Sequence, residues 1–188
     1  KRHLEGDGLP PRNAAVDVSN YVTLAFGQPL HTYDADSLPA KDIAATEAKG
    51  GEEYVGIGDV KVTCAEGDIL ITSGRQMIGL GAILGGESTA VTSDTTNVYI
   101  EAAWFERKQI ALTGQRLQLH TDARARFERG IDPAQTAWAG RYAAKLIQEI
   151  CGGEVSEQQC AGNVERKLPT IEFEPSLTKT FGGHYIPV

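Results

Sequence analysis

The sequence lacks the long hydrophobic runs that membrane segments need. None of its apolar stretches reaches the roughly 18 residues of a transmembrane helix, so we expect no association with a membrane. The N-terminus, residues 1–7, has neither a start Met nor the apolar core of a signal peptide. The absent Met suggests a piece of a longer chain, and the absent signal favours a cytoplasmic protein.

The sequence also lacks an excess of basic residues. Its 18 Lys and Arg against 25 Asp and Glu give a formal charge of −7, which argues against a general, tight nucleic-acid binder. Residues 105–130 depart from this balance, with six basic and three acidic side chains, a local +3 that leaves −10 for the rest. This stretch is either a patch that faces phosphates or a helix surface with internal ion pairs.

Cysteine is scarce, with three residues at Cys64, Cys151 and Cys160. An odd count, wide spacing and no secretory signal favour free thiols in a reducing compartment. The last two cysteines lie nine positions apart, with no Cys-x-x-Cys pair and no nearby His. We therefore expect no metal site.

The remaining composition, 41% apolar and 23% charged, is ordinary for a soluble globular domain. A helix is predicted between the N-cap residue Asn13 and Gly27, followed by a tight, ordered loop over residues 28–34. Turn signals then separate short apolar segments, with a hairpin turn at Gly58-Asp59. These segments predict strands at 43–47, 54–57, 60–63, 69–72, 78–84 and 98–103.

Helices are expected again in the second half of the chain, at 106–117, 122–129 and 133–150. A strand at 171–174 and a new helix from Pro175 follow. Closely spaced strands without intervening helices indicate mostly antiparallel pairing. The predicted fold class is therefore α+β, with mostly antiparallel sheet layers covered by helices.

Four segments carry candidate chemistry. Residues 17–21 cluster polar side chains within a helix, either on the surface or aimed at a ligand, and His31 lies on a stiffened loop, where it is structural or part of a site. The glycine-rich segment 79–87 superficially resembles a dinucleotide fingerprint, but no helix follows it, so it indicates a strand that another group approaches closely. Glu101 lies in an apolar strand, where an outward carboxylate is unremarkable and an inward one needs a specific partner.

These segments and one further motif follow one another in a fixed order, at residues 13–22, 27–34, 85–88, 100–105 and 120–133. Together they resemble the editing domain of the bacterial phenylalanyl-tRNA synthetase beta subunit, over roughly residues 8–165. The resemblance implies an α+β domain that hydrolyses Tyr-tRNA(Phe), an ester made because the synthetic site confuses Tyr with Phe. A second site is useful because a Phe pocket cannot strongly reject an analogue that merely adds a hydroxyl.

The resemblance also implies roles for individual residues. Glu101 matches the residue proposed for the phenol end, with the Ala82 N–H as a second phenol contact and Gly81 lining the ring. At the ester end it points to Ser19, Asn20 and His31, of which the last two would position the attacking water and the ester carbonyl. The remaining substrate-binding assignments are Thr121 and Ala123, the latter as a small residue of the pocket wall.

Three positions depart from the family pattern. Ser19 stands where the family usually has Thr, and Gly81-Ala82 stands where it often has Ala-Gly. Arg124 replaces a small polar residue near the pocket rim.

The resemblance predicts residues 1–168 as the editing domain and residues 169–188 as the start of the next beta-subunit module. It implies two partners, the acceptor end of tRNA(Phe) and the alpha subunit of the parent heterotetramer. No cofactor is implied for this domain, since the full synthetase uses ATP and magnesium elsewhere. The alternative is a non-catalytic module that docks the acceptor end or braces the synthetase.

Overall fold

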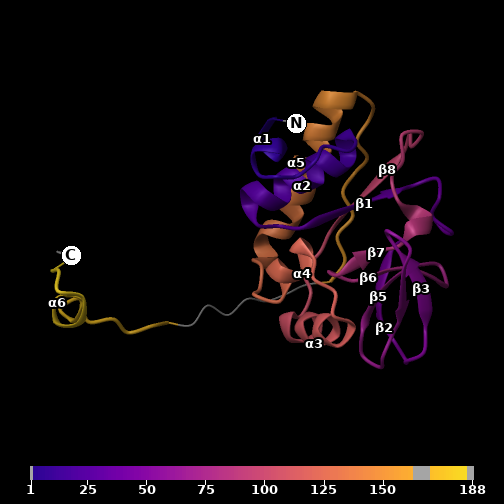
Figure 1. Cartoon of the computed structure of the whole chain (residues 1–188). Helices are drawn as coiled ribbons and strands as arrows, with labels where there is room; N and C mark the ends of the chain where they lie inside the picture. The colour runs from indigo at the N-terminus through magenta and orange to yellow at the C-terminus, as the bar shows by residue number, and fades with distance from the viewer. Residues whose placement is uncertain (1, 163–169, 186–188) are drawn as a thin grey trace.

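The computed structural model describes residues 2–162 and 170–185 (Figure 1). Its helices are α1 (Arg2–Gly6), α2 (Ala14–Phe26), α3 (Arg107–Leu117), α4 (Asp122–Phe127), α5 (Pro133–Cys151) and α6 (Leu177–Gly182), with a short 3-10 turn, η1 (Glu87–Thr89). Its strands are β1 (Leu30–Asp34), β2 (Ala44–Glu47), β3 (Glu53–Gly56), β4 (Val60–Thr63), β5 (Ile69–Ser73), β6 (Gln76–Leu80), β7 (Leu84–Gly85) and β8 (Val98–Ala102).

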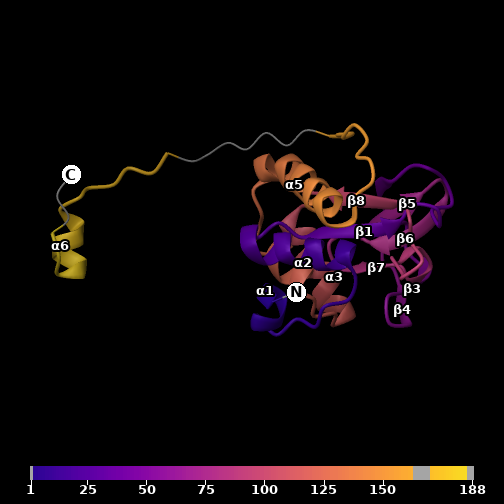
Figure 2. The same cartoon turned by 90° about the horizontal axis from the view of Figure 1, so that it is seen from above.

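Every strand pair of the named sheets is antiparallel. β1 pairs with β8, β3 pairs with β4, and a four-stranded sheet has the order β2-β5-β6-β7. Helices α2 and α5 pack on the β1–β8 ribbon, as Figures 1 and 2 show from two sides. The predicted α+β class with mostly antiparallel sheets and covering helices is confirmed.

Local sequence signals explain where the long helices begin and end. The Asn13 side chain accepts a hydrogen bond from the Val16 N–H at 3.0 Å, which caps α2, and Gly27 ends the helix in the left-handed region at φ 74°. Pro133 lies in the first turn of α5, and the Asp132 side chain accepts from the Ala134 N–H at 3.1 Å.

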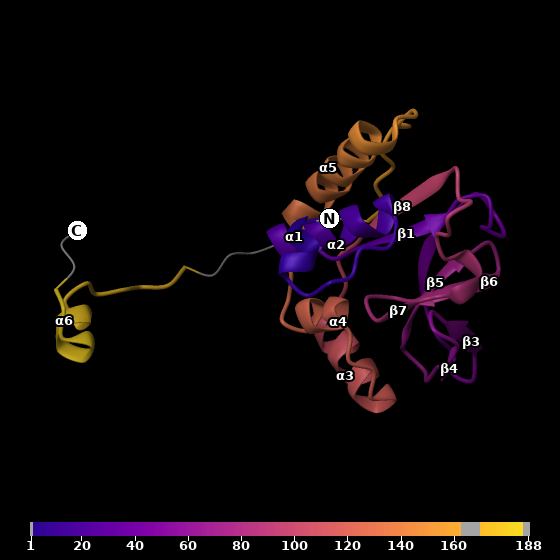
Figure 3. The same ribbon diagram turned by 45° about the horizontal axis from the view of Figure 1, so that its top comes forward.

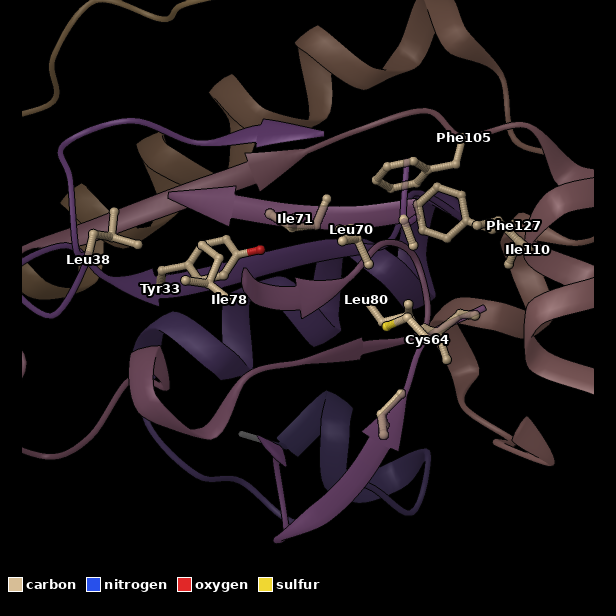
Figure 4. Packing of buried hydrophobic residues seen from close by; sticks show 13 residues of the cluster. Tyr33, Leu38, Cys64, Leu70, Ile71, Ile78, Leu80, Phe105, Ile110 and Phe127 are labelled. Carbon is tan, nitrogen blue, oxygen red and sulfur yellow. The ribbon is translucent and has the colours of Figure 1, made fainter. Parts of the chain in front are cut away.

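Two hydrophobic clusters stabilise the fold. The smaller one joins Val18 and Val22 of α2 to Ala139 and Ala143 of α5, whose small side chains let the two helices approach closely. The larger one lies between the four-stranded sheet and α3 and α4, which Figure 3 shows beside the β6–β7 end of that sheet. Its buried members are shown in Figure 4 and include Tyr33, Leu70, Ile71, Ile78, Leu80, Phe105, Ile110 and Phe127.

Three predicted elements differ from the structure. The expected loop over 28–34 is wrong, because residues 30–34 form strand β1 against β8. The single strand expected over 78–84 is also wrong: residues 81–83 turn the chain back, so β6 ends at Leu80 and β7 begins at Leu84. Residues 171–174 form no strand, and their side chains are exposed. The boundary predicted between residues 168 and 169 lies outside the described residues.

Two smaller details refine the predictions. The hairpin at Gly58-Asp59 forms, but its loop has three residues, because Gly56 pairs with Val60. The three cysteines are free, with Cys64 buried and the other two exposed.

Candidate active site

The register of the β1–β8 ribbon brings the predicted polar residues together. His31 lies directly opposite Glu101, and Tyr33 lies directly opposite Tyr99. Since side chains alternate between the two faces of a strand, His31 and Tyr33 share one face of β1. The ribbon therefore directs an imidazole, a phenol and a carboxylate to the same side.

This side of the ribbon borders a cavity of about 80 Å³. Its polar lining comes from His31, Tyr33 and Glu101. Most of the remaining lining is apolar side chain or glycine backbone from β5, β6, β7, their connecting turn and α4, including Ile71, Leu80, Gly81, Ala82, Gly85, Ala123 and Phe127. Pro29 and Leu30, at the start of β1, complete it. One water needs roughly 10–15 Å³ of such space, so the cavity has room for more than one.

The Glu101 carboxylate is bound at one oxygen. The Tyr33 hydroxyl donates a hydrogen bond of 2.5 Å to its Oε2. Burial raises the pKa of Glu101, because a low-polarity site disfavours the charged form, while the hydrogen bond from Tyr33 acts in the opposite direction. Tyr33 keeps its proton, because burial and then the nearby Glu101 charge raise its pKa far above the ordinary value.

His31 is held by packing rather than by hydrogen bonds. Its Nε2 is buried and has no hydrogen-bond partner among the described residues. Its ring meets the Tyr33 ring edge to face, with centroids 4.4 Å apart, and a Cβ on Gly85 would lie 2.5 Å from Nε2. Burial lowers the pKa of His31 to about 4, so the imidazole is neutral at pH 7.

The β6–β7 turn forms the wall opposite the ribbon. Gly81 donates its N–H to the Ile69 carbonyl at 2.8 Å, and Ile83 donates to the Leu80 carbonyl at 3.1 Å. Between them Ala82 has a left-handed backbone, with φ 63°. Its N–H makes no hydrogen bond within the part of the chain that the structure describes, so this donor is free for another acceptor.

Thr121 fixes this turn to helix α4. Its hydroxyl donates to the Ile83 carbonyl at 3.1 Å and accepts from the Arg124 N–H at 3.2 Å, which caps the helix. Thr121 is not among the cavity-lining residues, whereas Ala123, two residues further on, is. Substrate binding by Thr121 stays a prediction, and the geometry gives this residue a bracing position.

The two candidates on α2 lie outside the cavity lining. Ser19 is buried, and its hydroxyl donates to the Ala15 carbonyl at 3.0 Å within the helix. Asn20 is half-buried on the same helix. Their predicted roles at the ester remain predictions, while His31, Glu101, Gly81, Ala82 and Ala123 all border one space.

Most of the basic side chains in residues 105–130 form ion pairs. Arg116 pairs with Asp68, and Arg124 pairs with Glu128 at 3.1 Å. Arg126 lies 3.9 Å from Asp122, and Arg129 lies 4.0 Å from Glu128. These contacts favour the ion-pair interpretation over an open phosphate patch for four of the six basic residues.

Arg124 also turns away from the pocket rim. Its guanidinium donates to the Leu119 carbonyl at 2.7 Å and lies over Gly114 of α3, where any Cβ would clash with it. Arg124 does not line the cavity, so this departure from the family pattern leaves the pocket open.

Tyr33 is the site residue that the sequence analysis did not single out. The sequence pattern predicts a loop, not a strand, for the segment that contains it. A strand over 30–34 would have indicated it, because residues 31 and 33 then face the same side and His31 was already a candidate.

In the described ranges, 2–162 and 170–185, no group of three or more His, Cys, Asp or Glu side chains could hold a metal ion. The helices of this part of the chain are all too short or too polar to cross a bilayer.

Comparison with known proteins gives concordant matches. The family model of the B3/4 domain matches residues 1–152. The chain is 40% identical over 183 residues to the phenylalanine–tRNA ligase beta subunit of Gluconobacter oxydans, covering 97% of this chain and 22% of that protein. It is 43% identical over 152 residues to the beta subunit of Geobacillus kaustophilus, covering 81% of this chain and 19% of that protein.

The chain thus spans about a fifth of the length of these curated relatives. The matched segment contains the β1–β8 ribbon, the β6–β7 turn and helix α4, which together form the cavity. On the extent of the family match, this chain belongs to the B3/4 domain family.

Proposed function

We propose that the cavity receives the tyrosyl side chain of mischarged Tyr-tRNA(Phe) and that the domain hydrolyses the ester. The observation that carries the proposal is the Glu101 carboxylate, which borders a largely apolar cavity and has one oxygen bound by Tyr33. The cavity volume of about 80 Å³ is several times the space that one water needs.

Glu101 gives this cavity a reason to prefer Tyr over Phe. An ionised carboxylate only accepts hydrogen bonds, so its second oxygen suits a phenol O–H. A phenylalanyl ring would displace water from that oxygen and offer no donor in return. A hydrogen bond to a charged group contributes about 1.5–3 kcal/mol, which corresponds to a preference of roughly 10- to 150-fold. The free Ala82 N–H is a second contact for the phenol oxygen.

His31 is the residue we propose for the ester end. It is neutral at pH 7 because burial lowers its pKa to about 4, so a ring nitrogen can accept a hydrogen bond from water. Holding water and ester in a reactive geometry contributes much of the barrier reduction that an ester needs. Asn20 and Ser19 remain secondary candidates, since Ser19 already uses its hydroxyl within α2.

The relatives extend the proposal to a longer protein. The matched proteins are named phenylalanine–tRNA ligase beta subunits. We propose that this domain acts within such a subunit, beside an alpha subunit, on the acceptor end of tRNA(Phe) during protein synthesis.

Replacement of Glu101 tests the proposal. Glu101→Ala in the full-length protein is expected to slow deacylation of Tyr-tRNA(Phe) by roughly 10- to 100-fold. Deacylation of Phe-tRNA(Phe) should be unchanged, because that ester has no phenol hydroxyl. The matched control is Glu149→Ala, which removes an exposed carboxylate of α5 that pairs with Lys145. An unchanged ratio of the two rates in Glu101→Ala would contradict the proposal.

The competing function is a module that docks the acceptor end without cleaving it. Such a module would bind the tRNA but leave both esters intact. An enclosed carboxylate lies directly opposite an enclosed neutral imidazole in the strand register. This arrangement favours the hydrolase, because a structural brace requires neither group.

A further inference from the structure

Tyr33 is placed to control how Glu101 receives the substrate. Its side chain is 1% exposed, and its ring is held between the core cluster and the edge of His31. The backbone at Tyr33 is fixed as well, since it pairs with Tyr99 on one side and forms a bridge to Ala90 on the other. The hydroxyl that donates to Glu101 Oε2 at 2.5 Å therefore has little freedom to point elsewhere.

We infer that Tyr33 is a specificity-determining positioning residue, whose hydroxyl binds one oxygen of Glu101 and presents the other to the substrate phenol. This inference rests on the proposed function. It assigns Tyr33 no contact with the reacting ester. Tyr33 acts through Glu101 by fixing the orientation of the carboxyl group and by favouring its ionised form against the effect of burial.

The orientation follows from the pairing geometry. A carboxylate has two oxygens, and the Tyr33 hydroxyl holds Oε2. With one oxygen held, the other is directed by the planar group, and the bound phenol meets an acceptor whose position is already set. Without the Tyr33 hydroxyl the Glu101 side chain could rotate, and the substrate would have to bear the cost of ordering it.

The protonation state follows from the surroundings of Glu101. From β1 it faces His31 and Tyr33, its own strand contributes Tyr99, and Tyr54 of β3 lies close enough to influence Tyr33. From α4 the charged side chains are engaged elsewhere, Arg124 with Glu128 and Arg126 with Asp122. No described cation thus offsets the burial of Glu101, and Tyr33 is the group that favours its ionised form.

Tyr33→Phe tests the inference, because it removes only the hydroxyl and keeps the ring that packs against His31. In a titration above pH 5, where His31 stays neutral, carbon NMR of the Glu101 carboxyl should show its midpoint move to higher pH in the variant. Deacylation of Tyr-tRNA(Phe) by the full-length protein should fall about ten-fold or more at the acidic end of the titration, and by less at its basic end. Deacylation of Phe-tRNA(Phe) should not follow this profile.

The matched control is Tyr54→Phe. Tyr54 is half-buried, and its hydroxyl donates to the Leu84 carbonyl at 2.9 Å instead of to Glu101. The Tyr54→Phe variant should be less stable than the wild type, but the Glu101 midpoint and the pH profile of Tyr-tRNA(Phe) hydrolysis should not change. Fluorotyrosine at position 33 keeps the ring and strengthens the phenol as a donor, so it should move the Glu101 midpoint to lower pH even if Tyr33→Phe folds poorly.

The possible failures are distinct. If the wild-type protein hydrolyses both esters equally, the proposed function falls. If the wild type prefers the tyrosyl ester and Tyr33→Phe keeps both that preference and the wild-type Glu101 midpoint at every pH, only the inference about Tyr33 is overturned.

Discussion

Ala82 is the residue at which the turn beside the cavity is strained. Its φ of 63° lies in the left-handed region, where an L-residue with a Cβ is disfavoured by about 1–2 kcal/mol. Replacing Ala82 by Gly removes this strain. The same change gives the unfolded chain more freedom, which costs about 0.4–1 kcal/mol. We therefore predict that Ala82→Gly stabilises the fold by about 0.5–1 kcal/mol.

Thermal unfolding and urea unfolding both measure this gain. For a domain of this size, 1 kcal/mol shifts Tm by about 2–4 °C, so the expected rise is about 1–4 °C. The matched control is Ala144→Gly in the interior of α5, where the backbone is helical and glycine should cost about 1 kcal/mol. The two Ala→Gly changes are thus predicted to have opposite signs.

Gly81, next to Ala82, requires glycine for a different reason. A Cβ at this position would lie 2.9 Å from Ile69 Cγ2 and 3.2 Å from Phe105 Cε1, so Gly81→Ala should destabilise by about 1–3 kcal/mol.

If Ala82→Gly leaves Tm unchanged or lowers it, the left-handed turn is not strained and the description of this wall is wrong.

Three further predictions concern the cavity. Gly85→Ala should lower Tm and slow Tyr-tRNA(Phe) hydrolysis, because its Cβ would lie 2.5 Å from His31 Nε2; wild-type values for both would contradict the packing described for His31. Because the fold lowers the pKa of His31 from 6.5 to about 4, stability should be complete above pH 6.5 and fall as the pH drops towards 4, by up to about 3 kcal/mol. Urea unfolding of wild type and His31→Gln across this range should show a steeper loss for the wild type, and parallel curves would refute the burial of a neutral imidazole. Ala123→Trp should fill the cavity from α4 and block hydrolysis of Tyr-tRNA(Phe) while charging with Phe persists in the full-length protein; unaltered clearance of the tyrosyl ester would show that α4 is not a wall of the binding site.

The sequence predicted best where one residue decides the local structure. Asn13 and Gly27 mark the ends of α2 because a side-chain cap and a left-handed glycine act over a few residues. The same holds for Asp132 and Pro133 at the start of α5.

The sequence predicted poorly where pairing across the chain decides. Residues 30–34 contain polar side chains and follow Pro29, so they resemble a loop, yet β8 supplies a partner nearly seventy residues away. Residues 78–84 form a continuous apolar run, so no pattern shows that Gly81 and Ala82 reverse the chain.

The candidate site divides in the same way. The sequence pattern alone allows Glu101 to point inward or outward, and the family resemblance favours the inward position. In the structure this residue borders the cavity. Tyr33 escaped notice because its role depends on the β1 strand, which the sequence did not indicate. The motif on α2 predicts Ser19 and Asn20 as site residues. Which side of α2 faces the ribbon depends on tertiary packing, which a motif does not contain.

The central claim is that this cavity recognises a tyrosyl ester through its phenol. The most direct test is the initial rate at which the wild-type, full-length protein deacylates Tyr-tRNA(Phe) and Phe-tRNA(Phe), measured side by side at pH 7 and corrected for spontaneous hydrolysis. We predict that the tyrosyl ester is cleaved faster by roughly ten-fold or more. Equal rates for the two esters, or no cleavage of either above background, would contradict the claim.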